Sequence, residues 1–439
     1  MRPPAPTTDG LRPGQLVEAV IEKGVYRGRG LGRVDGRVVF VPRAHPGDRV
    51  RARVTEVHAG WAEGDLVEVL AAAPARRASP CPYVPWCGGC SYQDLDYDAQ
   101  LRGKESVLRE SLGRAGAPWE GPVAVHASPE IGWRMRASLH FSAGEKGLAL
   151  GLRQEGTRRV VDVLECLQLS ERMNRAARAL RDALAEKPAL GPRLRGLDLL
   201  ESPDGGTLLA ALETTLAPRE GPPLVSLAAR VPGLDGFGVA TGPRLQWLHG
   251  APFVEASVLG VVLRARTRSF FQANRFLLEP LARTVVDLVP AGDGRVVDLY
   301  AGVGLFALPL AARGERDVLA VEWSSSAADD ARWAAHRNGL DRVVRVVAGD
   351  VAKALAEAGP GTGERIVLDP PRTGAGPEVV ALVADRAPAA IVYVSCDPPT
   401  LGRDLAALAA RGYRPDVVHL FDLFPDTFHM ETVVRLRRS

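Results

Sequence analysis

Three segments in the C-terminal half of the sequence carry side chains suited to covalent and acid–base chemistry. Asp369 precedes two prolines, which form a stiff, non-helical corner and hold the carboxylate in one place. Cys396 follows an apolar run and precedes an aspartate and a proline, a setting that favours a nucleophile over a small buried hydrophobic residue. Glu431, in the sequence His-Met-Glu before the last apolar run, is by itself as compatible with a surface carboxylate as with a base. These residues predict nucleophilic catalysis.

A glycine-containing turn and two further acids predict a nucleoside site. Gly302 and Gly304 follow an apolar run and let a ligand approach the backbone closely. The dinucleotide fingerprint is incomplete, because Ala307 stands where its third glycine would be. Glu322 ends the next apolar run, where an acid can bind ribose hydroxyls, and Asp350 follows the third run. These acids fit a nucleoside without a pyrophosphate, which is what S-adenosylmethionine presents.

The other four cysteines are grouped as metal ligands would be. Cys81, Cys87 and Cys90 fall within ten residues in a C-x5-C-G-G-C pattern, and Cys166 follows later in the chain. Four thiolates suit a tetrahedral zinc or an iron–sulfur cluster, and the number of ligands does not distinguish the two. Disulfides are less expected in a reducing compartment. The first spacing, of five residues, also differs from the x3 and x2 spacing of radical S-adenosylmethionine enzymes.

The catalytic candidates need a scaffold that brings them together. From about residue 277 onward, short apolar runs alternate with helical stretches, which predicts a parallel, doubly wound sheet. Ligands of such sheets lie beyond the carboxyl ends of the strands, where the candidate residues fall. The expected strands are 296–299, 318–321, 343–347, 366–368, 391–394 and 433–434, with a helix over 325–338.

The N-terminal region has a different pattern. Strands are expected over 16–21, 37–41, 49–57 and 65–70, and so many in about 60 residues predict a small closed β-barrel. Nine basic residues from Lys23 to Arg53 accompany only Asp35 and Asp48, which favours binding to a phosphate backbone.

The two patterns flank a mixed region, so we expect an α/β protein of three domains. They are a barrel over 1–73, a central α+β domain with the clustered cysteines over 74–266, and a Rossmann-like catalytic domain over 267–439. The central domain is expected to contain strands over 136–142, 159–164, 207–212 and 253–263 and a helix over 171–185.

The overall composition is that of a globular protein. The chain has 439 residues, 46% of them hydrophobic and 24% charged. Its 55 basic and 52 acidic residues give a net charge of +3, which conceals the basic N-terminal stretch. No apolar run reaches the ~18 residues of a membrane span, and the first ten residues lack the apolar core of a signal peptide. We therefore expect a cytoplasmic protein with no membrane partner.

In combination, these segments resemble the RNA (uracil-5-)-methyltransferase family, specifically its members with an N-terminal TRAM domain and an iron–sulfur cluster. Asp369–Arg372 and Ser395–Leu401 match the family's catalytic motifs, and His429–Glu431 matches its terminal His-x-Glu. Gly28–Arg33 resembles the glycine-rich turn of the OB-like TRAM barrel, which binds RNA, and Phe270–Asn274 resembles the family's Phe-Gln-x-Asn segment.

The resemblance implies a reaction and a set of site residues. Cys396 would add to carbon 6 of uracil, carbon 5 would take the methyl group of S-adenosylmethionine, and Glu431 would remove the carbon-5 proton. The implied cofactor contacts are Gln272, Tyr300, Glu322, Asp350 and Asp369. The resemblance also favours a [4Fe–4S] cluster over zinc at Cys81, Cys87, Cys90 and Cys166.

Several functions are compared on this basis. The expected product is 5-methyluridine in structured RNA, with 23S ribosomal RNA favoured and transfer RNA second. A non-catalytic RNA-binding protein on this fold would not need both Cys396 and Glu431. An enzyme that methylates an adenine amino nitrogen through Asp369–Pro371 would have no use for Cys396.

Overall fold

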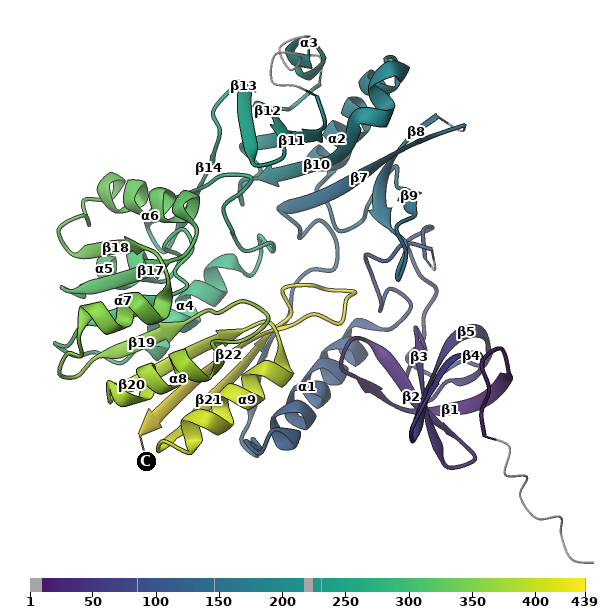
Figure 1. Ribbon diagram of the computed structural model, residues 1–439, viewed down its shortest axis with the longest axis horizontal. Helices are drawn as coiled ribbons and strands as arrows, with labels where there is room; N and C mark the ends of the chain where they lie inside the picture. Colours follow the sequence, from purple (N-terminus) through teal and green to yellow (C-terminus); the bar gives the residue numbers. More distant parts are fainter. Residues whose placement is uncertain (1–9, 85, 146, 217–223, 230, 439) are drawn as a thin grey trace, which may run out of the picture. The chain divides into compact units, whose positions relative to one another are not determined.

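The computed structural model describes residues 10–84, 86–145, 147–216, 224–229 and 231–438 (Figure 1). The chain forms two compact units. Unit 1 comprises Met1–Val84, Cys90–Val107 and Asp426–Phe428, and unit 2 comprises Pro85–Gly89, Leu108–Pro425 and His429–Ser439. Within the described ranges, every helix is too short or too polar to cross a membrane.

Unit 1 contains a closed five-stranded barrel with the strand order β1-β2-β3-β5-β4. Alternate residues of β1 point inward, so that Val17 and Ile21 are buried with Val39 and Val50 in the barrel core. The predicted barrel is confirmed, and it has one more strand than expected, because the glycine-rich segment is itself β2. The strands are β1 (Leu16–Val25), β2 (Arg29–Val34), β3 (Arg37–Pro42), β4 (Arg49–His58) and β5 (Trp61–Ala71).

Strand pairing changes the charge expected for this barrel. Arg29 forms an ion pair with Glu63, and Arg51 lies 2.9 Å from Glu18 and 2.7 Å from Glu68. These glutamates belong to β1 and β5, outside the stretch in which bases outnumber acids. The one-sided charge expected from the local sequence is therefore partly neutralised by acids that the fold brings alongside.

Unit 2 contains a seven-stranded sheet with the order β13-β12-β11-β10-β7-β8-β9. The amphipathic helix α2 (Glu171–Ala185) begins and ends where the sequence predicts, and its buried face joins the core of this sheet. The strands are β7 (Arg136–Gly144), β8 (Gly147–Arg153), β9 (Val160–Asp162), β10 (Leu194–Glu201), β11 (Leu208–Thr214), β12 (Gly236–Thr241) and β13 (Arg244–His249). A 3-10 helix (Pro188–Arg193) and α3 (Val225–Ala228) accompany them.

The second sheet of unit 2 has eight strands in the order β18-β17-β16-β19-β20-β22-β21-β6. The first five are parallel neighbours, as predicted. The prediction was wrong for the run 433–434, because it belongs to β22, which is antiparallel to β20 and β21. The strands are β6 (Val123–His126), β16 (Val296–Leu299), β17 (Val318–Glu322), β18 (Val344–Ala348), β19 (Arg365–Leu368), β20 (Ala390–Ser395), β21 (Tyr413–Phe421) and β22 (Glu431–Arg438).

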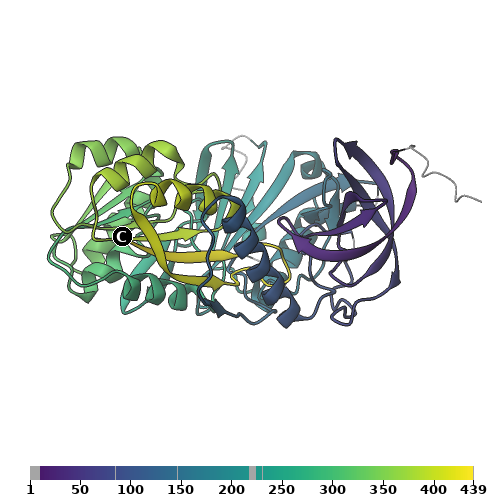
Figure 2. The same cartoon turned by 90° about the horizontal axis from the view of Figure 1, so that it is seen from below.

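Helices cover both faces of this sheet. In two perpendicular views, α4 and α5 lie on one face and α8 and α9 on the other (Figures 1 and 2). Because both faces of the sheet are covered, β16 and β20 are buried throughout, and their residues are apolar except for Asp298 and Ser395. The helices are α4 (Leu278–Leu288), α5 (Ala307–Arg313), α6 (Ser325–Arg337), α7 (Val351–Ala358), α8 (Gly376–Asp385) and α9 (Pro398–Ala409), in addition to α1 (Tyr97–Arg114).

Strands β8, β10, β12, β13 and β21 and helix α1 have no counterpart in the sequence prediction, and two further elements also differ from it. The expected strand over 253–263 is a hairpin of β14 (Val254–Val258) and β15 (Val261–Ala265), turned by Leu259 and Gly260, both at positive φ. The edge of the catalytic sheet is β6, whose residues lie more than 250 positions before its partner β21 in the chain. Such a pairing has no local sequence signal.

Candidate active site

The carboxyl ends of the parallel strands surround one cavity of about 920 Å³ in unit 2. Because neighbouring parallel strands end at the same edge of the sheet, the loops after β16 to β20 converge there. Every predicted catalytic and cofactor-binding residue lines this cavity. They are Gln272, Tyr300, Glu322, Asp350, Asp369, Cys396 and Glu431.

One end of the cavity, which we call the donor-rich end, consists of Gly302, Glu322 and Asp350. Glu322 accepts hydrogen bonds from the backbone N–H of Gly302 at 2.8 Å and of Ser324 at 2.7 Å. Gly302 has a φ of +56°, and a Cβ built on it would meet no atom closer than 4.0 Å, so its backbone faces open space. This geometry fixes the carboxylate of Glu322 beside an open glycine turn, as a nucleoside site requires.

Asp350 and the neighbouring Trp323 extend the surface of this end. Asp350 is the N-cap of α7, and its carboxylate accepts from the backbone N–H of Lys353 at 2.9 Å. Trp323 follows Glu322 directly, lines the cavity and is 74% exposed. An exposed indole next to Glu322 provides a flat apolar surface on which a planar ring can stack.

A second part of the cavity lining, which we call the thiol end, consists of Asp369, Cys396 and Glu431. Cys396 follows β20, whose last residue, Ser395, pairs with Thr432 of β22, and this register places Glu431 at the same end of the sheet. Glu431 is buried, and its Oε1 atom has no hydrogen-bond partner among the described residues. A buried carboxylate oxygen without a partner is unusual outside functional sites.

Burial controls the ionisation of the thiol end. The pKa of Cys396 is raised to about 12 by burial and by the charge of Glu431, while the guanidinium of Arg372 acts in the opposite direction. The pKa of Glu431 is raised well above its ordinary value by burial and by Asp369. The pKa of Asp369 is raised by burial and by Glu322. Without substrate, the thiol end therefore favours its protonated forms.

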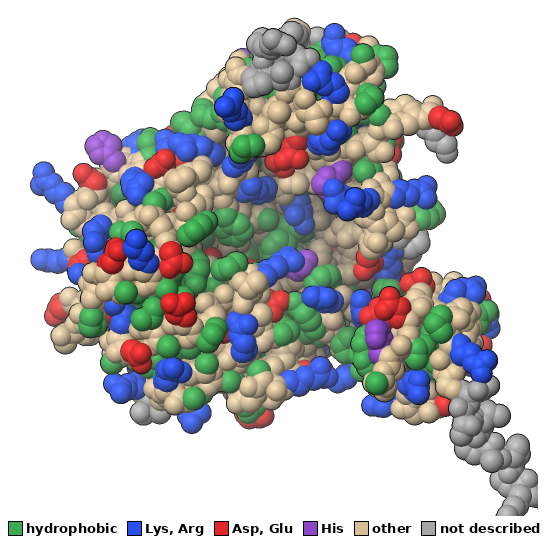
Figure 3. Space-filling model, in the orientation of Figure 1, with side chains coloured by type: hydrophobic (Ala, Val, Ile, Leu, Met, Phe, Trp, Pro, Cys, Tyr) green, Lys and Arg blue, Asp and Glu red, His purple; other side chains and the backbone are tan. Residues whose placement is uncertain are grey.

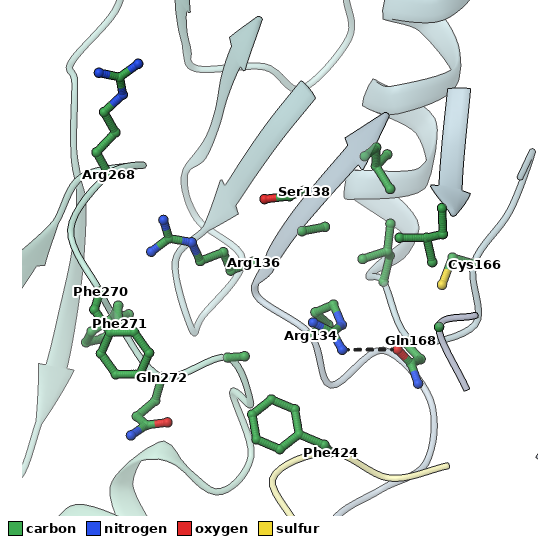
Figure 4. A pocket seen from close by; sticks show the side chains of 16 residues that line it. Arg134, Arg136, Ser138, Cys166, Gln168, Arg268, Phe270, Phe271, Gln272 and Phe424 are labelled. Atoms are coloured by element: carbon green, nitrogen blue, oxygen red, sulfur yellow. Dashed lines mark hydrogen bonds between the residues drawn. The ribbon is translucent and has the colours of Figure 1, made fainter. Parts of the chain in front are cut away.

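A second cavity of about 510 Å³ adjoins the first and shares Phe270, Gln272 and Phe424 with it. Figure 4 shows Phe270, Phe271 and Gln272 in succession along one segment, across from Arg134 and Gln168, whose side chains are joined by a hydrogen bond. On the face seen in Figure 3, the molecule is hollowed between the two sheets of unit 2, and basic and hydrophobic side chains gather around the hollow.

Sequence reasoning missed several residues that line the larger cavity. Arg372 and His429, which lie 3.4 Å apart, fall within the recognised motifs, and Trp323 follows Glu322 directly. Their positions in the sequence could therefore have identified them as site residues. Phe424 had no such signal, because it lies in the loop between β21 and β22 with no motif around it.

The four clustered cysteines are divided between the two units. Cys81 and Cys90 belong to unit 1, and Cys87 and Cys166 to unit 2. Across the described ranges, no group of three or more His, Cys, Asp or Glu side chains is arranged to hold a metal ion. All five cysteines, Cys396 included, lie in those ranges and carry thiols outside any disulfide. A four-thiolate site is thus not contained in either unit.

The fold and the larger cavity define a class of protein. A doubly wound sheet with a glycine turn after its first strand and an acid after its second is the architecture of an S-adenosylmethionine-dependent methyltransferase, and a partly buried thiol lines the same cavity.

Comparison with known proteins identifies the family. The tRNA (uracil-5-)-methyltransferase family profile matches residues 257–439, and the TRAM domain profile matches residues 11–67. The 23S rRNA (uracil(1939)-C(5))-methyltransferase of Pseudomonas putida is 35% identical over 434 residues, covering 94% of this chain and 92% of that protein. An uncharacterized RNA methyltransferase of Gloeobacter violaceus is 32% identical over 460 residues, with 98% of each chain covered.

A solved structure agrees with the sequence comparisons. The Pyrococcus abyssi tRNA (uracil-54, C5)-methyltransferase in complex with S-adenosyl-L-homocysteine superposes with a TM-score of 0.74 at 26% identity, covering 95% of this chain and 99% of that one. The chain belongs to the RNA (uracil-5-)-methyltransferase family. The predicted enzyme class, the S-adenosylmethionine dependence and the TRAM domain are thereby confirmed.

Proposed function

We propose that this enzyme converts a uridine of 23S ribosomal RNA to 5-methyluridine. The observation that carries the proposal is the placement of Cys396 and Glu431 on one cavity with the acids of a nucleoside site. Relatives with 34% and 35% identity are 23S rRNA methyltransferases, which favours ribosomal RNA and the cytoplasm, where that RNA is found. Transfer RNA is the second candidate, because the Pyrococcus abyssi relative acts on it.

The first chemical step activates the base. Carbon 5 of uracil is too weak a nucleophile to take a methyl group unaided. The sulfur of Cys396 forms a bond to carbon 6, and the electrons of the C5–C6 double bond shift toward oxygen 4, which makes carbon 5 enolate-like. The thiol must first lose its proton, which passes to solvent. Arg372 supports this loss, because its guanidinium lowers the pKa of Cys396 against the effect of burial and Glu431.

The second step transfers the methyl group and restores the base. Carbon 5 attacks the methyl carbon of S-adenosylmethionine, and the carbon–sulfur bond breaks with its electron pair left on the departing S-adenosylhomocysteine. Glu431 then takes the proton of carbon 5, the C5–C6 double bond re-forms, and the Cys396 sulfur leaves carbon 6 as a thiolate. The raised pKa of the buried Glu431 makes its carboxylate a stronger proton acceptor than an exposed one.

The residues that bind the cofactor follow from the two ends of the cavity. We assign Glu322 to the ribose hydroxyls, with Tyr300, Asp350, Asp369 and Gln272 as the remaining contacts. A cationic sulfonium is also complementary to the acids of this cavity.

The RNA must present a single base to this cavity. Carbon 6 of a stacked uracil is out of reach, so the target nucleotide leaves its stack, at a cost of a few kcal/mol. Phe270 is 62% exposed at the junction of the two cavities, and its ring offers a surface for an unstacked base. The TRAM barrel supplies further RNA contacts.

Covalent trapping tests the mechanism. In RNA that contains 5-fluorouridine, carbon 5 bears fluorine in place of the proton that Glu431 removes. With S-adenosylmethionine present, methylation then stops at the Cys396 adduct, and we expect a protein–RNA complex that survives denaturing electrophoresis. The Cys396→Ala variant, as the matched control, should form none. Failure of an active preparation to form the complex would contradict the mechanism.

The substrate is tested separately. Ribosomal and transfer RNA isolated from a strain that lacks the gene would be incubated with enzyme and labelled S-adenosylmethionine. We expect label as 5-methyluridine in 23S RNA and none in transfer RNA. Label in transfer RNA alone would reverse the substrate assignment and leave the chemistry intact.

We further propose a [4Fe–4S] cluster bound by Cys81, Cys87, Cys90 and Cys166. The four thiols and the cysteine spacing support it, together with hydrogen bonds to sulfur of the kind that stabilise thiolates. The backbone N–H of Gly89 lies 3.4 Å from the sulfur of Cys87. No catalytic step above uses this group.

Metal analysis of protein purified without oxygen tests this assignment. We expect about four iron atoms and four sulfides per chain, and their loss from a Cys87→Ala/Cys90→Ala variant but not from Cys396→Ala. One zinc atom per chain would indicate a zinc site in place of the cluster. The absence of both iron and zinc would refute both assignments.

A further inference from the structure

The segment that carries Phe270 and Gln272 is held in place by buried polar contacts that the catalytic assignment does not use. We define the strap as residues 266–272, which connect the β14–β15 hairpin to the segment that leads into α4. Its side chains alternate sharply in exposure: Ser269 is fully buried, Phe270 is 62% exposed, and Phe271 and Gln272 are buried again.

The strap is anchored from α6 by the carboxylate of Asp330 and by the hydroxyl of Ser326, which lies 3.1 Å from the Ser269 hydroxyl. Asp330 is fully buried, and it accepts a hydrogen bond from the Ser269 hydroxyl at 2.6 Å. Its other oxygen lies 2.7 Å from Arg264 Nε and 3.4 Å from Arg266 Nε, so its charge is balanced without Ser269. Ser269 therefore adds a directional bond to a carboxylate that is already neutralised.

The opposite side of the strap is held by a guanidinium. Arg136, on β7 of the seven-stranded sheet, donates to the backbone carbonyls of Thr267 and Ser269. Figure 4 shows the Arg136 side chain beside the segment that carries Phe270 and Gln272. Asp330 therefore binds the side chain of Ser269, and Arg136 binds its backbone carbonyl. Ser269 lies three positions before Gln272.

We propose that Ser269 and Asp330 are positioning residues, whose hydrogen bond sets the placement of Gln272 in the cofactor cavity. The inference rests on the cofactor contact assigned to Gln272 above. It adds that this contact depends on α6, the helix that follows Glu322 after a two-residue turn. The strand–helix unit that supplies the ribose-binding acid thus also fixes the amide approaching from the strap.

The informative variant is Ser269→Ala. Replacing Asp330 would leave two partly buried guanidinium groups without their carboxylate, and the fold itself would be expected to suffer. Ser269→Ala removes only one hydroxyl, whose bond to a charged acceptor corresponds to roughly a 10-fold effect. Affinity for S-adenosylhomocysteine, measured by calorimetry on the full-length protein without RNA, should fall about 10-fold. Ser269→Thr, which keeps the hydroxyl, should restore it.

A matched control lies two residues away. The Thr267 hydroxyl is buried in the same strap and has no hydrogen-bond partner among the described residues. Thr267→Val should therefore leave cofactor affinity unchanged, although it alters the strap as much as Ser269→Ala does.

Epistasis separates positioning from a general structural role. If Ser269 acts through Gln272, Ser269→Ala should have no further effect on affinity in a Gln272→Ala background. An equal loss in both backgrounds, or no loss in either, would overturn the proposal. Because the measurement uses neither RNA nor Cys396, its failure is distinguishable from a failure of the uridine mechanism, which the fluorouridine trap reports.

Discussion

The two glutamates of the catalytic cavity differ in how their carboxylates are hydrogen-bonded. At the donor-rich end, both oxygens of Glu322 accept backbone hydrogen bonds, from Gly302 and Ser324. At the thiol end, Glu431 is buried with an oxygen that has no partner among the described residues, and its pKa is raised by burial and by Asp369. The carboxylate of Glu322 is thus held in place before any ligand binds, whereas one oxygen of Glu431 is left without a hydrogen bond among the described residues.

The difference follows from what each end is assigned to do. A carboxylate that binds neutral ribose hydroxyls works best when it is fixed and ionised, and backbone donors achieve both. A base that must accept a proton from carbon works better with a raised pKa, which requires desolvation and few donors. The thiol end therefore sacrifices stability for reactivity, and the donor-rich end does not.

The largest expected effect tests the thiol end. Cys396→Ala removes the nucleophile, and methyl transfer to RNA should fall by at least roughly 10⁴-fold. Affinity for S-adenosylmethionine should stay within about twofold, because the donor-rich end is untouched. Labelled methyl transfer and calorimetry measure the two quantities. Full methylation by this variant would favour a methyltransferase that acts on an adenine amino nitrogen.

Glu431→Gln tests the later step at the same end. The variant keeps the shape of the side chain but cannot accept the proton, so turnover should fall about 10²- to 10⁴-fold. Because methyl transfer precedes proton removal, a methylated Cys396–RNA adduct should accumulate with ordinary, unfluorinated RNA. Mass spectrometry of the protein–RNA complex detects it, and unchanged turnover would reject Glu431 as the base.

Most residues of both ends could be predicted from the sequence. Glu322, Asp369 and Cys396 each follow an apolar run, and a parallel sheet gathers such positions at one edge. Strand recognition was therefore enough to place them together. Glu431 belongs to an antiparallel strand, and only the family resemblance assigned its role.

The features that the sequence did not predict depend on contacts between distant segments. Phe424 reaches the cavity from a loop without a motif, and Asp330 looks like an ordinary helix residue until its contacts with the strap are seen. The barrel charge was overestimated for the same reason, because Glu63 neutralises Arg29 from a strand outside the basic stretch. Local patterns locate strand ends well, and they do not reveal which residues tertiary packing adds.

A smaller effect is expected at the donor-rich end. Glu322→Gln retains one carbonyl oxygen for two backbone donors and loses the charge, and hydrogen bonds to charged groups contribute about 1.5–3 kcal/mol. Affinity for S-adenosylmethionine should fall roughly 10- to 100-fold. Turnover at saturating cofactor should change little, because the thiol end is intact. A loss of turnover without a loss of affinity would move Glu322 from cofactor binding to the chemistry.

The smallest effect is on stability, and its sign should differ between the two glutamates. A carboxyl whose pKa is higher in the folded than in the unfolded state stabilises the fold at low pH, and this contribution is lost as pH rises above the unfolded value. Glu431→Gln cannot ionise, so its stability relative to the parent should rise from pH 5 to pH 8, by about 1 kcal/mol or ~2 °C in melting temperature.

Glu322→Gln should instead melt below the parent, by a similar amount, because two backbone N–H groups lose their charged acceptor. Thermal denaturation of the parent and both variants at pH 5 and pH 8 measures all four shifts under matched conditions. If both variants shift in the same direction at pH 8, the two ends do not differ as their hydrogen bonds indicate. If the shifts diverge, the carboxylate of Glu431, which lacks a hydrogen-bond partner on one oxygen among the described residues, destabilises the fold, whereas the hydrogen-bonded carboxylate of Glu322 does not.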